Sequence, residues 1–121
     1  MTNMLESAVN RGTARSLRSK YQLKGAIAGK RGTTQNQSDG WFIGYTPKFS
    51  AGAWVGAENP GIHFESISEG AGSKTALPIW VNFALNLQND PDCDHLLEGV
   101  FSPPTAKSLR CLNQSLYRER K

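Results

Sequence analysis

The sequence GKRGTTQNQSDGWFIGYTPKFSAGAWVG, residues 29–56, decides the fold of this chain. Residues 41–46 are rich in aromatic and β-branched side chains, which favours a strand. Residues 51–56, which include Trp54 and Val55, are predicted to form a second strand. Residues 47–50 are short enough to link the two strands as a hairpin. The segment before them, residues 25–34, is glycine-rich, which disfavours a helix and lets another backbone approach closely. Three extended segments joined by short links predict an antiparallel sheet.

Helical patterns flank this sheet on both sides in the sequence. Residues 2–10 place their apolar side chains on one face, with Thr2 or Asn3 as the expected N-cap. From Ser73 to Leu87 the chain is apolar nearly all round, which predicts a helix buried against the sheet. The fold class is therefore α+β, with a three-stranded antiparallel sheet and helices at the N-terminal and C-terminal sides.

The connecting segments are expected to be irregular. Residues 13–24 and 57–72 are polar or glycine-bearing and are predicted to be loops. Pro78 must lie in the first turns of its helix or kink it. The chain after Asp90 is polar and contains several prolines, and we expect it to pack loosely or extend.

Size and charge narrow the range of functions. With 121 residues the chain forms one modest domain at most, and its net charge is +4. The basic residues gather in residues 1–31, where Glu6 is the single acid. This asymmetry favours an anionic partner, which charge alone leaves open among nucleic acid, a phosphate and a carboxylate-bearing substrate. No apolar run in the sequence is long enough for a membrane span, and residues 1–30 lack the apolar core of a signal peptide.

Several motifs are weak or absent. The segment 25–30 resembles a phosphate-binding loop, but only three residues separate its glycines and Arg31 follows its lysine, so we reject that interpretation. His63 and His95 are isolated, and no metal or other cofactor is expected. Cys93 and Cys111 are too few for a disulfide scaffold, and whether they pair stays open. The basic quarter holds only Tyr21 as an aromatic residue, which disfavours nucleic acid as a partner.

The order of motifs from Gly29 onward carries a family resemblance. Gly29-Lys30-Arg31-Gly32-Thr33-Thr34, then 39–47 (DGWFIGYTP) and 53–56 (AWVG), resembles the end of the transpeptidase domain of class A penicillin-binding proteins. Residues 2–13 and 76–80 resemble the same family, so that the likeness covers residues 1–90, with a tail at 91–121. The resemblance implies part of the β-lactamase/transpeptidase-like fold.

The family's chemistry is serine acyl transfer on a peptidoglycan stem peptide, and β-lactams acylate the same serine. By resemblance, Lys30 contributes to the electrostatics and the proton network of the cleft, and the backbone N–H of Thr33 is an oxyanion donor. Arg31, Gly32, Thr33 and Thr34 are the expected substrate-binding residues. Gly32 leaves room for an extended peptide to pair with the strand edge.

Two departures from the family limit what this chain does alone. Arg31 stands where the family has a threonine that binds the substrate carboxylate, and we expect the longer side chain to impair binding. Neither Ser-x-x-Lys nor Ser-x-Asn occurs, so the sequence has no matching nucleophile. We therefore expect a transpeptidase fragment that is inactive alone, from a truncated, split or incompletely read gene.

The expected partners are a stem peptide or β-lactam in the complete enzyme and the missing upstream part of the same domain. The parent enzyme is expected to be membrane-anchored and periplasm-facing. The alternative is a non-catalytic interaction fragment or, ranked third, a basic nucleic-acid-binding module.

Overall fold

The computed structural model describes residues 1–103. Its centre is an antiparallel sheet of strands β1 (Ala28–Thr33), β2 (Asp39–Tyr45) and β3 (Ser50–Gly56), in the order β1-β2-β3. The expected sheet and hairpin are thus confirmed. In its register Lys30 lies opposite Ile43 and Arg31 opposite Phe42, and Trp41 lies opposite Trp54.

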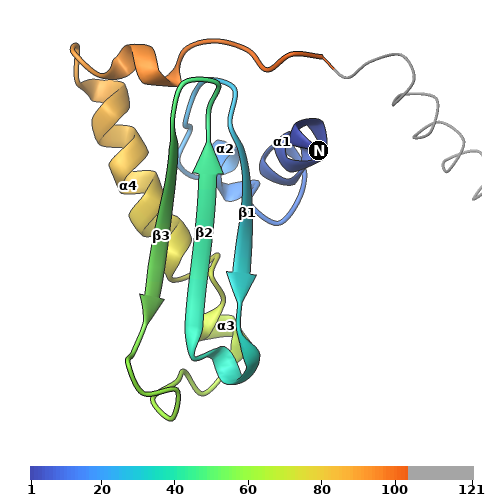
Figure 1. The fold of residues 1–121 in the computed structure, drawn as a ribbon, viewed down its shortest axis with the longest axis vertical. Coiled ribbons are helices and arrows are strands. Elements are labelled where there is room, and N and C mark those ends of the chain that lie inside the picture. Colours follow the sequence, from blue (N-terminus) through green and yellow to red (C-terminus); the bar gives the residue numbers. More distant parts are fainter. Residues whose placement is uncertain (104–121) are drawn as a thin grey trace, which may run out of the picture.

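Two long helices accompany the sheet (Figure 1). Helix α1 (Thr2–Asn10) lies beside β1, and helix α4 (Ala76–Asn89) packs on one face of β2 and β3. Both helices were expected, and Pro78 is the third residue of α4, where its missing N–H lacks an intrahelical partner anyway. The expected side-chain N-cap of α1 is wrong: Met1 occupies that position, and no side chain caps the helix.

Short helices interrupt the segments that we expected to be loops. Helix α2 (Ser16–Ser19) lies within residues 13–24, and α3 (Ile67–Gly70) lies within residues 57–72. Two short 3₁₀ helices are also present: η1 (Gln35–Gln37) follows β1, and η2 (Asp94–Leu97) follows α4. Helices of one turn depend on tertiary contacts because nucleation is costly, and their local sequence signal is correspondingly weak.

The core lies between the sheet and the helices. Phe42 and Trp80 are almost fully buried and meet edge to face, with ring centroids 5.3 Å apart. Phe49 stacks on the same indole at 6.4 Å, and Trp80 Nε1 donates to the Ala51 carbonyl at 3.0 Å. The fully buried large side chains are Trp80, Phe42, Leu17, Ile27, Leu77, Val9 and Val81. Burial of α4 is incomplete, because Ile79 and Phe83 on its other face are about half exposed.

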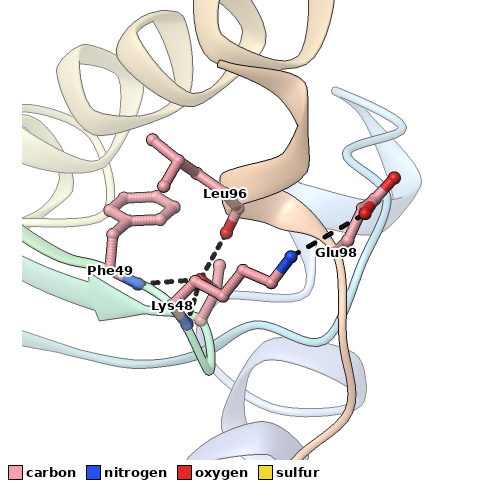
Figure 2. Close-up of polar contacts among 5 residues, drawn as sticks. Lys48, Phe49, Leu96 and Glu98 are labelled. Atoms are coloured by element: carbon pink, nitrogen blue, oxygen red, sulfur yellow. Dashed lines mark hydrogen bonds and ion pairs between the residues drawn. The ribbon is translucent and has the colours of Figure 1, made fainter. Parts of the chain in front are cut away.

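The segment after α4 is fastened to the β2–β3 turn (Figure 2). Thr46 is buried, and its hydroxyl donates to the Leu96 carbonyl at 2.7 Å while accepting the N–H groups of Lys48 and Phe49 at 3.2 Å each. Lys48 Nζ also lies 3.8 Å from the Glu98 carboxylate. The expected loose packing after Asp90 is therefore wrong for this segment, in which Leu97 is buried. Cys111, and with it the question of a Cys93–Cys111 pair, lies outside the described residues.

Candidate substrate-binding strand

Strand β1 lies at one edge of the sheet. In an antiparallel pair, alternate residues direct their N–H and C=O groups toward the neighbouring strand, and the residues between them direct theirs away. The N–H of Thr34 donates to the Asp39 carbonyl at 3.1 Å, which sets this alternation. The backbone groups of Arg31 and Thr33 therefore point to the outer edge of β1, where no strand of the described residues pairs with them.

The side chains of β1 alternate between the two faces of the sheet. Lys30 shares the outer face with its partner Ile43, and Gly32 lies on the same face beside Trp41. A Cβ atom added to Gly32 would lie 3.6 Å from the Cβ of Trp41, an ordinary contact. Arg31 is paired with the buried Phe42 and so lies on the helix side. The outer face therefore offers the Lys30 ammonium next to a strand position with no side chain.

Lys30 is exposed, and its ammonium folds back on its own strand. Nζ donates to the Arg31 carbonyl at 2.8 Å, one of the backbone groups at the outer edge. This bond holds the positive charge beside the unpaired edge of β1. A carboxylate approaching that edge meets both the ammonium and an outward N–H of the strand.

Arg31 and Thr33 contact the segment that leads into α4. The Arg31 guanidinium donates to Ser73 Oγ at 3.2 Å, and the side chain is half-buried. The Thr33 hydroxyl accepts the Gly72 N–H at 3.1 Å. The structure therefore separates the Lys30 side chain from the Arg31 and Thr33 side chains, which lie on opposite faces of one strand.

The hydroxyl of Thr34 belongs to the turn between β1 and β2. It accepts the Asp39 N–H at 3.0 Å, lies 2.9 Å from Ser38 Oγ and donates to Asp39 Oδ2 at 3.2 Å. The same carboxylate, through Oδ1, accepts Trp54 Nε1 at 2.9 Å. Thr34 thus orders the turn and the start of β2.

Three apolar side chains remain exposed on the outer face. Trp41, Ile43 and Trp54 are 44%, 53% and 46% exposed, and the two indoles lie 6.3 Å apart. Contiguous apolar side chains on one face of a sheet mark a surface that another element covers. The sequence did not predict the contact of Arg31 with Ser73, because these residues are 42 positions apart and no local pattern indicates it.

No helix within residues 1–103 has the length and apolar character needed to cross a membrane.

Comparisons with known proteins point to one family. Over 112 residues the chain is 35% identical to penicillin-binding protein 1A of Pseudomonas aeruginosa. The matched region covers 91% of this chain and 12% of the relative. The chain is 38% identical over 91 residues to penicillin-binding protein 1A of Rickettsia bellii, covering 74% of this chain and 11% of the relative. The relative from Vibrio cholerae is 42% identical over 77 residues, 54% of this chain and 9% of its own length.

The fold comparison agrees with these relatives. The crystal structure of penicillin-binding protein 1A from Haemophilus influenzae matches 85% of this chain and 15% of its own, with a TM-score of 0.64 and 25% identity. No protein-family model matches the chain. The chain spans about a tenth of the length of the curated relatives that it matches.

Proposed function

We propose that this chain, which belongs to the penicillin-binding protein 1A family, forms the carboxylate-binding wall of a D,D-transpeptidase active site. The observation that carries the proposal is the position of Lys30, exposed at an unpaired strand edge with its ammonium on the edge carbonyl of Arg31. Residues 1–90 form this part of the transpeptidase domain, and residues 91–121 form its tail.

The last four residues of β1 and Thr34, which follows them, have roles in the proposed site. Lys30 attracts the terminal carboxylate of the stem peptide and takes part in proton transfer. The outward N–H of Thr33 is positioned as an oxyanion donor, and an extended peptide adds to the edge of β1 beside Gly32. Arg31 borders the carboxylate site from the helix side, and Thr34 holds the turn that ends it.

The nucleophile comes from another stretch of polypeptide. Its serine hydroxyl attacks the carbonyl between the two terminal D-alanines, and the terminal D-alanine leaves as the peptide bond breaks. An amine of a neighbouring stem then attacks the acyl-enzyme, which forms the cross-link and returns the serine. Because no lysine here follows a serine at the third position, the chain alone is inactive.

The exposed outer face supports a complementary piece of the same domain as the partner. A sheet that leaves Trp41, Ile43 and Trp54 half exposed, and whose two edge strands pair with no further strand of residues 1–103, is an aggregation hazard when it stands alone. We expect the chain by itself to be only marginally stable. A cooperative, reversible melt of a monomeric chain would contradict this expectation. The complete enzyme would be membrane-anchored and face the periplasm.

Labelling with a fluorescent penicillin tests the proposal. The chain is incubated alone and together with a polypeptide that carries the preceding part of a penicillin-binding protein 1A transpeptidase domain. We expect acylation of the serine in that polypeptide only in the mixture. Lys30→Ala should remove the labelling, whereas Lys48→Ala, which changes a lysine at the β2–β3 turn, should leave it within about twofold. Labelling that persists with Lys30→Ala would refute the role of this strand.

Arg31 gives a second test in the same mixture. Its guanidinium is larger than the threonine of the family and is held against Ser73. We expect Arg31→Thr to raise the rate of acylation, because the shorter hydroxyl side chain restores the family's carboxylate contact. Equal labelling of both forms would show that Arg31 does not impair binding.

The alternative, a non-catalytic interaction fragment, is favoured by the absence of Ser-x-x-Lys. The same mixture separates the two functions. Binding to the complementary polypeptide without any acylation would support the interaction fragment.

A further inference from the structure

A cationic cavity lies on the helix side of the molecule, apart from the outer edge of β1. It has a volume of about 340 Å³ and is bounded by residues 12–21, which include α2, and by the segment that leads into α4. Among its lining residues, three are basic and three carry an aliphatic hydroxyl: Arg15, Lys20, Lys74, Thr13, Ser16 and Ser73. None of the lining residues found within residues 1–103 is acidic.

The three basic side chains lack carboxylate partners in residues 1–103. The ion pair found in this part of the chain joins Lys48 to Glu98, far from the cavity lining. Arg15, Lys20 and Lys74 are all exposed. Positive groups that share one concavity without a counter-charge produce a focused field that attracts an anion.

Ser73 links the cavity to β1 and supplies a hydrogen-bond donor. Its oxygen accepts the Arg31 guanidinium at 3.2 Å, which leaves its O–H free to donate. The same bond places a fourth cation, the Arg31 guanidinium, next to Ser73 at the side of the cavity. Two ammonium groups, two guanidinium groups and a hydroxyl donor suit a tetrahedral, multiply charged oxyanion better than a single carboxylate.

The size of the cavity and its aromatic wall favour an organic phosphate over a bare ion. A volume of about 340 Å³ is near the lower end for small-molecule sites. Tyr21 lines the cavity, and Lys20 Nζ lies 5.1 Å from the centroid of its ring. A phosphate that draws the Lys20 ammonium away from this ring would uncover an amphipathic surface for the sugar-sized group attached to it.

We propose that the cavity bounded by Arg15, Lys20 and Lys74 binds a phosphorylated small molecule, with the phosphate among these cations and the organic part against Tyr21. The source of the phosphate is a soluble sugar phosphate or diphosphate, or the head group of a lipid. This site uses side chains other than Lys30 and stands independently of the proposed transpeptidase role. Two of its cations, Arg15 and Lys20, belong to the basic residues 1–31, where a nucleic acid would need more aromatic residues than Tyr21.

Calorimetric titration of the 121-residue chain with pyrophosphate in 150 mM NaCl tests the site, because that salt screens contacts of exposed single charges. We expect saturable binding with one pyrophosphate per chain. Arg15→Gln and Lys74→Gln should each weaken it by about three- to tenfold, the size of effect expected for losing one charge-assisted contact at a partly exposed site. Lys24→Gln removes the same charge from the same basic quarter outside this cavity, and it should change the affinity by less than about twofold.

Two further arms identify the source of the phosphate and keep the test independent of folding defects. Arg15→Lys should restore most of the affinity lost in Arg15→Gln, which a misfolded variant would not allow. Sedimentation with phosphatidylcholine vesicles, with and without phosphatidic acid, tests the lipid source. Binding to vesicles that is stronger than binding to pyrophosphate, with the same ranking of variants, assigns the head group.

Three results would overturn the proposal. The first is the absence of binding to both pyrophosphate and acidic vesicles. The second is equal weakening by Lys24→Gln and Lys74→Gln, which would indicate a diffuse positive field. The third is tighter binding of a single-stranded oligonucleotide that all these variants weaken alike. Loss of penicillin labelling in the mixture described above would leave this test unaffected, since Lys30 lies outside the cavity and none of Arg15, Lys20 and Lys74 belongs to the proposed transpeptidase site.

Discussion

Gly44 lies beneath Trp80, and adding one methyl group there tests how closely the sheet and α4 are packed. A Cβ at this position would lie 2.6 Å from Cζ2 and 2.7 Å from Cε2 of the indole, and 3.0 Å from the Phe42 ring. Carbon atoms do not approach so closely, so an atom must move. Trp80 is 1% exposed and is held by its bond to Ala51 and by two aromatic neighbours, which leaves it little room.

The magnitude follows from two opposing effects. Overpacking a close-packed core costs about 1–3 kcal/mol. Replacing glycine by alanine reduces the entropy of the unfolded chain and returns about 0.4–1 kcal/mol. We therefore expect Gly44→Ala to lower the free energy of unfolding by about 1–2 kcal/mol. With a urea slope of about 1.5 kcal/mol per molar, the midpoint falls by about 1 M.

Gly52→Ala is the matched control, because this residue is also a strand glycine but faces the open side of the sheet. Its Cβ would lie 3.6 Å from Ile43 Cγ1, an ordinary contact, so the variant should equal or slightly exceed the parent in stability. Urea unfolding followed by tryptophan fluorescence measures both variants. In a Trp80→Phe background, the cost of Gly44→Ala should fall below about 1 kcal/mol, since the smaller phenyl ring lacks the fused indole atoms that the new methyl group meets. Equal midpoints for the two alanine variants would refute the packing argument.

Three further perturbations have definite expected outcomes. Arg18 donates to two loop carbonyls and to the side chain of Asn10, so Arg18→Ala should cost about 1–3 kcal/mol in chemical unfolding. Its control Arg15→Ala, at an exposed residue, should stay within about 0.5 kcal/mol, and equal losses would contradict the role of these bonds. Thr46→Val removes the hydroxyl that donates to the Leu96 carbonyl and should lower the free energy of unfolding by about 1–2 kcal/mol. Thr34→Val, in the exposed turn, should lower it by less. The reverse order in a thermal melt would be evidence against this attachment of the C-terminal segment. Desolvation raises the pKa of the Cys93 thiol, and the neighbouring aspartates raise it further by a smaller amount. In a Cys111→Ser chain, alkylation of Cys93 by iodoacetamide should therefore require a higher pH in the native chain than in the urea-unfolded chain. A faster reaction of the native chain at pH 8 would contradict this.

The partly buried charge of Arg18 has a physical consequence of its own. Desolvation lowers the pKa of its guanidinium, and the nearby Glu6 carboxylate raises it in part. The side chain nevertheless remains charged, because an arginine pKa lies far above neutral pH. Its role is to hold α2 to the segment that enters β1, and this contact orients the edge strand.

Several elements were predictable because their signals are local. The spacing of apolar residues predicted α1, whose observed bounds agree with the prediction, and the aromatic segments predicted the β2–β3 hairpin. The Lys-x-Gly triplet, read together with the two strands that follow it, pointed to the family that the comparisons show. The roles of Lys30 and Thr33 in a substrate site remain predictions.

Other features had no local signal. The short helices α2 and α3 are one turn long, and tertiary packing decides whether such turns form. The contacts of Arg31 with Ser73 and of Thr46 with Leu96 join residues 42 and 50 positions apart. The cationic cavity likewise combines Lys74 with two basic residues of the first quarter.

The amino-acid order alone determined where the strands run and which residues alternate along them, because backbone propensity and a two-residue period act over a few neighbours. It also determined that Lys30 and Arg31 must lie on opposite faces of a strand. Only the tertiary structure decided what each face meets: Ser73 behind Arg31, an edge beside Lys30 that no strand of residues 1–103 pairs with, and an indole over Gly44 but not over Gly52. Two glycines of the same sheet differ in this way because close packing is a property of the assembled layers, in which distant segments fill the same volume.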